Sequence, residues 1–345
     1  MEMAKLILHL DVNKTLIMVD KLSGKTSLTS MIDSLLSECV WGRIREGTAA
    51  ETRTVEDWVM HAPEPSTTPP GEGLVTFSEY LEEYTRLPKE EVRAAKLTFT
   101  EGLVDLQRHR AMLLSEMMAP DGSEHFIVPA FFNLVTELRI RRVDFALVFR
   151  TFGKDLQAFA EVWNDFCAGT HPHFPLSPPA PELMLHLPAQ SASIRRTGDE
   201  SACGVVLAHV CPASRAVTLS HGPAEMRDAI NLLVSGGPQR SLFISDDYDY
   251  WAVHNESDCS GKLLLLDAAL DSETRHVFFD DNIERHRSHI VDVRRRAAPG
   301  GGFDAVPFAQ AVAEGCLVRA EPLDIITNRR YFIQALELRG HLSAR

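Results

Sequence analysis

Four short apolar runs, each followed at once by a polar cluster, constrain the fold of this chain more than any other feature. A strand with one solvated face alternates apolar and polar side chains, whereas these runs are nearly continuous. Nearly continuous runs of this length are typical of strands that are buried on both faces, as in a parallel sheet. The runs are LILHL (6–10), VDFALVF (143–149), SLFIS (241–245) and HVFF (276–279).

The segments between these runs include helix-like stretches, for example 128–141 and 155–169. Alternation of strands and helices predicts an α/β fold, in the form of a doubly wound parallel sheet with helices on both faces. In such sheets, ligands bind at the carboxyl ends of the strands. The four polar clusters lie at those ends and therefore form a candidate site.

A long segment separates the first two predicted strands and indicates a unit of its own. It contains three helix-like stretches and a polar linker at 61–73 that is rich in proline, glycine and threonine. We therefore expect a mostly helical cap over residues 28–128, inserted after the first strand, and an α/β core formed by residues 1–27 and 129–345. The expected helices of the cap lie at 28–42, 76–86 and 88–118.

A second stretch, at about 170–222, is expected to be an irregular insertion in the core. Six of the 21 residues from Thr170 to Gln190 are proline, which disfavours regular structure. The two segments that follow, 191–210 and 215–221, are expected to form a small hairpin. Edge strands are then expected at 290–296 and 316–326, and a final helix near 328–339.

Charge and composition argue against several classes of protein. The formal net charge of −13 argues against nucleic acid or an anionic membrane surface as the main partner. No apolar stretch approaches the roughly 18 residues of a membrane span, and the first residues, MEMAKLILHLD, lack the features of a secretory signal. The six cysteines are scattered without a C-x-x-C pair, as is typical of reduced thiols. The sequence thus predicts a cytoplasmic protein and gives no oligomeric state.

The polar clusters contain residue types that suit phosphate chemistry. Asp11 follows the first strand, where its carboxylate can attack an electrophile such as phosphorus, although a lone aspartate also fits a simple turn. Asp280 and Asp281 follow the last strand, and adjacent carboxylates repel one another unless a cation or hydrogen bonds relieve them. Together with Asp11 they offer oxygen ligands for one Mg²⁺, and a solvated turn is the alternative.

Two further residues complete the candidate site. Thr151 ends the second strand, and its hydroxyl group with the next backbone N–H can hold a phosphoryl oxygen. Lys262 is expected at the start of a helix, because it precedes Asp280 by about the length of one helix and its turn. Its ammonium group can offset the charge of a phosphate and of Asp11. Lys154 is a competing candidate for the same role.

The order of these features resembles the haloacid dehalogenase-like superfamily of hydrolases. The matching pieces are LHLDVNKTL, LVFRT, the GK pair at 261–262 and FFDDN, which bracket most of the chain. The resemblance implies a Rossmann-like core, a cap after the first strand, and Mg²⁺-dependent phosphoryl transfer through an aspartyl-phosphate. The implied roles are nucleophile and metal ligand for Asp11, a backbone-carbonyl ligand at Asn13, phosphate binding by Thr151, charge compensation by Lys262, and metal binding by Asp280 and Asp281.

Asn13 departs from the pattern of the phosphatases in this superfamily, which usually have an aspartate two residues after the nucleophile. That aspartate protonates the leaving group and later activates water, whereas an asparagine donates a hydrogen bond but exchanges no proton. Loss of a general acid/base commonly costs roughly 10²–10⁴ in rate. Three explanations stay open: a substrate with a good leaving group, an acid supplied by the cap, or a site that binds phosphate or metal without turnover.

The predicted function is a Mg²⁺-dependent phosphohydrolase or phosphotransferase of this type. A large cap favours a small phosphorylated metabolite over a macromolecule as the substrate. The alternative is a non-catalytic phosphate- or metal-binding regulatory protein on the same scaffold, and Asn13 is its main support.

Overall fold

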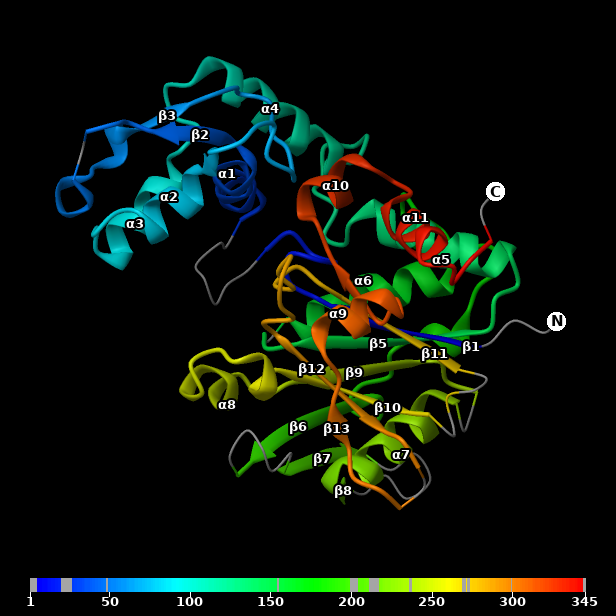
Figure 1. The fold of residues 1–345 in the computed structure, drawn as a ribbon. Helices are drawn as coiled ribbons and strands as arrows, with labels where there is room; N and C mark the ends of the chain where they lie inside the picture. Colours follow the sequence, from blue (N-terminus) through cyan, green and yellow to red (C-terminus); the bar gives the residue numbers. More distant parts are fainter. Residues whose placement is uncertain are drawn as a thin grey trace. The chain divides into compact units, whose positions relative to one another are not determined.

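The structure is a computed structural model that describes residues 5–343 except 20–26, 48, 154, 199–203, 211–216, 236–237, 269–270, 272–273 and 299. The chain divides into two compact units, and each is described by itself (Figure 1). Unit 1 comprises Met1–Ile17, Pro129–Ala320 and Arg330–Arg345. Unit 2 comprises Met18–Val128, which includes the expected cap, and also Glu321–Arg329, which the sequence analysis assigns to the core.

An eight-stranded, largely parallel sheet forms the centre of unit 1, which confirms the α/β class. Its strand order is β14-β11-β1-β5-β9-β6-β7-β8, and the pairs from β14 to β6 are all parallel. Four of its adjacent strands are the four predicted ones, and each is buried along most of its length, as expected for a sheet that is covered on both faces. These strands are β1 (Lys5–Asp11), β5 (Phe145–Thr151), β9 (Ser241–Ser245) and β11 (Thr274–Asp280).

The hairpin predicted within the irregular insertion is instead a three-stranded meander that extends the main sheet. β6 pairs in parallel with β9, and β7 and β8 follow in antiparallel order. The buried side chains of Ala192 and Ile194 join the same core cluster as those of β9, so that long-range packing fixes the position of β6. The strands are β6 (Ser191–Thr197), β7 (Gly204–Val210) and β8 (Val217–His221), and the preceding proline-rich stretch contains the short 3₁₀ turn η3 (Pro181–Leu183).

A second, three-stranded sheet lies against the main one. Its strands are β10 (Lys262–Asp267), β12 (Val291–Arg296) and β13 (Asp304–Ala305), with β12 in the middle rather than at an edge. Lys262 therefore begins a strand, not a helix. The side chains of β10 alternate: Leu263 and Leu265 join the core cluster of the main sheet, whereas Leu264 and Leu266 pack with β12. The predicted edge strand at 316–326 is shorter, β14 (Leu317–Arg319), and it is paired with β11.

Helices cover both faces of the main sheet (Figure 1). On one face, Phe149 of β5 packs against Phe131, Phe159 and Trp163. On the other face, Val148 of β5 belongs to the core cluster that contains residues of α7. The helices of the first face are α5 (Pro129–Ile140), α6 (Leu156–Ala168) and α11 (Tyr331–Leu338). The helix on the second face is α7 (Gly222–Ser235). The shorter helical elements of unit 1 are α8 (Tyr248–Val253), α9 (Phe308–Ala313) and the 3₁₀ turn η4 (Asp258–Ser260).

Unit 2 combines helices with a small antiparallel sheet that the sequence analysis does not predict. The single helix expected at 88–118 is two helices, α3 and α4. Between them, Thr100 donates a hydrogen bond to Asp33 of α1 at 2.7 Å, and Gly102 adopts a φ of +77°. The elements are α1 (Leu28–Cys39), α2 (Phe77–Glu83), α3 (Lys89–Leu97), α4 (Val104–Glu116), α10 (Pro322–Thr327), β2 (Trp41–Ile44), β3 (Trp58–Met60), β4 (Val75–Thr76), η1 (Ala50–Thr52) and η2 (Val55–Asp57).

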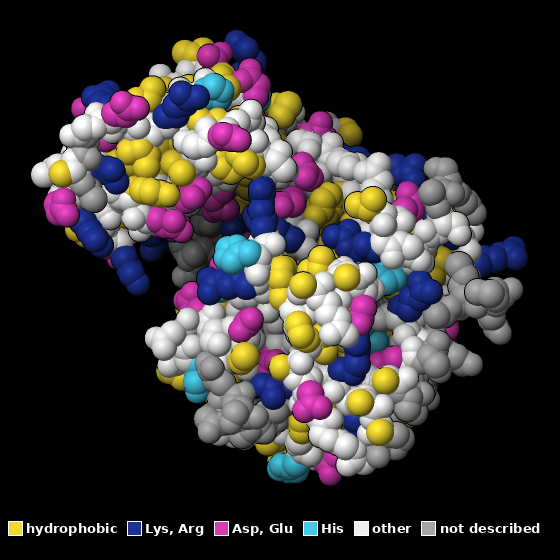
Figure 2. Space-filling view, in the orientation of Figure 1, with side chains coloured by type: hydrophobic (Ala, Val, Ile, Leu, Met, Phe, Trp, Pro, Cys, Tyr) yellow, Lys and Arg dark blue, Asp and Glu magenta, His cyan; other side chains and the backbone are white. Residues whose placement is uncertain are grey.

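The charged side chains are interspersed on the surface that Figure 2 shows. Basic and acidic groups are mixed over the visible face of each unit, so that in this view the acidic side chains do not form one continuous patch. Of the helices in the described part of the chain, none has both the length and the apolar character needed to cross a bilayer.

Candidate active site

Asp11 is the last residue of β1, and the chain turns directly after it. The backbone N–H groups of Leu16 and Ile17 both donate to the carbonyl of Val12 at 2.9 Å, and the N–H of Lys14 donates to the carbonyl of Ile17 at 2.8 Å. Lys14 adopts a φ of 60°, in the left-handed region that costs non-glycine residues roughly 1–2 kcal/mol. This tight turn fixes the residues after Asp11 at the carboxyl end of the sheet.

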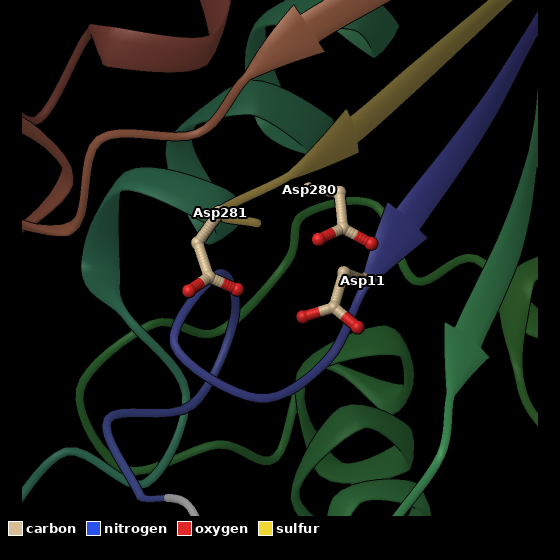
Figure 3. Close-up of side chains that lie close together, drawn as sticks. All are labelled: Asp11, Asp280 and Asp281. Atoms are coloured by element: carbon tan, nitrogen blue, oxygen red, sulfur yellow. The ribbon is translucent and has the colours of Figure 1, made fainter. Parts of the chain in front are cut away.

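Three carboxylates converge at this end of the sheet. The parallel register pairs Leu10 of β1 with Phe279 of β11, so that Asp11 and Asp280 end neighbouring strands at the same level. Each of Asp11, Asp280 and Asp281 offers one carboxylate oxygen, and these oxygens lie within 4.8 Å of one another. Figure 3 shows the three groups facing a common space between the ends of β1 and β11. The sequence pattern groups these three residues, and the structure brings them together.

Two lysines accompany the carboxylates. The ammonium group of Lys262 donates hydrogen bonds to Asp11 Oδ1 and, at 2.7 Å, to Asp280 Oδ2. Its side chain is only 1% exposed. The ammonium group of Lys14 lies 3.1 Å from Asp281 Oδ2. Lys262 thus reaches Asp11 although it begins a strand, because β10 starts at the edge where β1 and β11 end.

Burial is the main influence on the protonation of the cluster. Burial raises the pKa of Asp11 well above its ordinary value; Lys262 opposes this rise, while Asp280 and Asp281 add to it. Burial also raises the pKa of Asp281, against the effect of Lys14. Burial by itself lowers the pKa of Lys262, but Asp11 and Asp280 outweigh it, so that the pKa is raised and the lysine stays charged. A further cation would stabilise the ionised carboxylates.

Thr151 and Asn13 lie together beside this cluster. Thr151 Oγ1 donates to Asn13 Oδ1 at 3.0 Å and accepts a hydrogen bond from the backbone N–H of Gly153 at 2.7 Å. Asn13 Nδ2 donates to Asp155 Oδ2 at 3.3 Å. The structure thus places the hydroxyl group of Thr151 and a backbone N–H next to the loop that follows Asp11. Lys154, the competing candidate lysine, lies outside the described residues.

A buried arginine attaches the strand of Lys262 to the main sheet. Arg150 of β5 is paired in register with Asp11, and its guanidinium group donates to both carboxylate oxygens of Asp246 and to the carbonyl of Leu263. Arg196 of β6 likewise donates to the carbonyl of Gly261. These hydrogen bonds hold the backbone of Gly261 and Leu263, the residues on either side of Lys262 in the chain.

Aromatic rings border the site next to Thr151. Lys262 Nζ lies 5.0 Å above the ring centroid of Phe152, and Phe152 stacks on Trp251 with 5.4 Å between the ring centroids. Tyr248 packs edge-on against Phe152 at 5.6 Å. The DDYDYW segment, 246–251, therefore contributes rings to the border of the site, while its two leading aspartates bind arginines of the sheet.

Three of the neighbours described here, Lys14, Asp155 and Asp246, receive no individual role from the sequence, although Lys14 and Asp246 belong to the polar clusters that follow the first and third predicted strands. Signals for the first two are local, because Lys14 shares the loop of Asp11 and Asp155 follows Thr151 by four residues. Asp246 follows the strand at 241–245 directly, but nothing local indicates its partner, since its pairing with Arg150 joins distant parts of the chain. Comparison of the chain with family models, curated proteins and solved structures found no match.

Proposed function

We propose that this protein is a Mg²⁺-dependent phosphohydrolase or phosphotransferase of the haloacid dehalogenase type, acting through a phosphorylated Asp11. The observation that carries the proposal is the convergence of Asp11, Asp280, Asp281 and Lys262 on one point at the strand ends. The parallel order of the central strands, with helices on both faces, supports the Rossmann-like core that such enzymes share.

The carboxylates fit the requirements of Mg²⁺. This ion takes oxygen ligands in an octahedron at about 2.0–2.1 Å, so that neighbouring ligands lie about 3 Å apart and opposite ligands about 4 Å apart. The carboxylate oxygens of Asp11, Asp280 and Asp281 lie within 4.8 Å of one another, so that small side-chain shifts would bring them to these separations. These residues, with the backbone carbonyl of Asn13, would hold the ion. When bound, Mg²⁺ would neutralise charge on the phosphoryl group and on Asp11.

The side chains of the protein have separate roles in the proposed reaction. A carboxylate oxygen of Asp11 attacks phosphorus, the bond to the leaving oxygen breaks, and the electron pair stays on the leaving oxygen. Lys262 is held charged beside Asp11 and offsets the negative charge of the phosphoryl group. The Thr151 hydroxyl binds a phosphoryl oxygen by turning its single proton from Asn13 Oδ1 to the phosphoryl group, together with backbone N–H groups of its turn. Water then attacks the phosphorylated Asp11 and restores the carboxylate.

A small phosphorylated compound is the proposed substrate. The chain enters unit 2 directly after the loop of Asp11, and unit 2 is a compact structure of its own, as expected for an inserted cap. The alternative is a regulatory protein that binds phosphate or metal without turnover; Asn13, which offers no exchangeable proton, is the observation in its favour.

The test is phosphate release from a panel that includes acetyl phosphate and aryl phosphates, with and without Mg²⁺. We expect metal-dependent release that Asp11→Asn abolishes. The matched control is Asp144→Asn, which makes the same chemical change just before the opposite end of β5, at a side chain that is 55% exposed. Release that is unaffected by Asp11→Asn would overturn the proposal, and binding of phosphate without turnover of any substrate would support the regulatory alternative.

A further inference from the structure

The side chain of Asn13 is held in one orientation by two hydrogen bonds. Its Oδ1 accepts from Thr151 Oγ1 at 3.0 Å, and its Nδ2 donates to Asp155 Oδ2 at 3.3 Å. Rotation of the amide by half a turn would place Oδ1 against the Asp155 carboxylate, an acceptor against an acceptor. Asp155 therefore fixes the amide with its oxygen toward Thr151.

The surrounding chain prevents the Asn13 side chain from moving away. A Cβ atom on Gly153 would lie 2.9 Å from Asn13 Oδ1, which shows how closely this backbone approaches the amide. The loop itself is closed by the hydrogen bond from the Lys14 N–H to the carbonyl of Ile17. Asp155 is only 8% exposed and directly precedes α6. Asn13 is therefore a fixed part of the site rather than a mobile surface residue.

The titratable groups that contact Asp11 or its partners are engaged with one another. Lys262 is bound by Asp11 and Asp280, and Lys14 by Asp281. Beside them, the fixed amide of Asn13 can donate a hydrogen bond to a leaving oxygen but cannot give it a proton. In unit 1, the residues described here stabilise negative charge on the leaving group, and the amide of Asn13 supplies no proton to it.

We infer that the natural substrates are phosphates whose leaving group departs as a stable anion, namely acyl phosphates and phosphoanhydrides. The inference rests on the proposed function and names its substrate class. When the bond from phosphorus to a carboxylate or phosphate oxygen breaks, that oxygen keeps the electron pair and needs no proton. An alkoxide with the same electron pair is too basic to leave unprotonated.

The amide of Asn13 also affects the second step, the hydrolysis of the phosphorylated Asp11. Water attacks phosphorus, the bond to Asp11 breaks, and the carboxylate keeps the electron pair. Both protons of the water leave with the released phosphate and then equilibrate with solvent. Because the amide of Asn13 accepts no proton from the attacking water, this step is slow, and the phosphorylated form of Asp11 accumulates during turnover.

The experiment compares four substrates in order of increasing basicity of the leaving group: acetyl phosphate, p-nitrophenyl phosphate, phenyl phosphate and glycerol phosphate. We expect kcat/KM of the wild-type protein to fall steeply along the series. Asn13→Asp should raise kcat/KM for glycerol phosphate by roughly 10²–10⁴-fold. For acetyl phosphate it should change kcat/KM little, because kcat/KM reports the transfer of the phosphoryl group to Asp11, and it should raise kcat, because kcat reports the slow hydrolysis of the phosphorylated Asp11. Asn231→Asp, the same chemical change on α7, should leave the whole series unchanged.

A second measurement does not depend on the behaviour of the Asn13 variant. Acid quenching of the wild-type protein during turnover of acetyl phosphate, followed by mass spectrometry, should show one added phosphoryl group on Asp11. An equal kcat/KM for glycerol phosphate and acetyl phosphate in the wild-type protein, or no phosphorylated Asp11 during turnover, overturns the inference alone. A lack of turnover of acetyl phosphate, or turnover that survives Asp11→Asn, overturns the proposed function and the inference with it.

Discussion

The buried ion pair between Arg150 and Asp246 should respond very differently to removal of one partner and to removal of both. Two hydrogen bonds join the side chains: Arg150 Nε donates to Oδ2 at 2.9 Å, and Nη2 donates to Oδ1 at 2.5 Å. The two side chains are 0% and 2% exposed. Removing one partner of such a pair leaves a buried charge without compensation, whereas replacing both by apolar residues is often neutral.

The expected effect of Asp246→Asn is a loss of roughly 3–5 kcal/mol in the free energy of unfolding of unit 1. Arg150 cannot turn to solvent without cost, because it also donates to the carbonyl of Leu263 at 3.1 Å and lies 5.2 Å above the ring of Phe278. The double variant Arg150→Met with Asp246→Leu should recover most of this loss. It should still weaken the attachment of β10, because the bond to Leu263 is gone.

The assay is hydrogen exchange of the full chain at increasing urea concentration, read by mass spectrometry on peptides from β5 and β9, which report unit 1. The matched control is Glu314→Gln, which breaks a pair with Arg295 between side chains that are 35% and 27% exposed. That change should cost below about 1 kcal/mol. The reasoning is refuted if Asp246→Asn costs no more than the control, or if the double variant is no more stable than Asp246→Asn alone.

Two more predictions concern cation binding and pH. Lys14→Gly removes the ammonium group from Asp281, and glycine tolerates the positive φ of this position. The affinity for Mg²⁺, measured by calorimetry, should therefore rise by roughly tenfold. An unchanged affinity would show that Lys14 does not compete with the cation. Burial lowers the pKa of His341, and the guanidinium groups of Arg275 and Arg339 add to this effect against the carbonyl of Gly315. The unfolded chain then binds more protons than the folded chain below about pH 6.5, so the free energy of unfolding should fall as the pH drops from 7 to 5. His341→Gln should reduce this slope in urea unfolding; an unaltered slope would contradict the assignment.

The sequence alone determined the central strands and the carboxylates at their carboxyl ends. Continuous apolar runs identify strands that are buried on both faces, because only such strands bury every side chain. The polar residues that follow must then lie at the carboxyl edge of one sheet. This reasoning groups Asp11, Asp280 and Asp281 before any coordinates are known, and the register of β1 with β11 places them at one level.

The tertiary structure decided which side chains complete the site. The pattern of apolar and polar residues along a segment indicates which faces of a helix or strand are buried, but it does not indicate which distant element packs against them. The run that begins at Lys262 is therefore compatible with a helix start in the sequence, and only the packing of β10 on the main sheet brings its first residue to Asp11. The fixed amide of Asn13 has the same origin, since its two hydrogen-bond partners, Thr151 and Asp155, lie more than a hundred residues away along the chain.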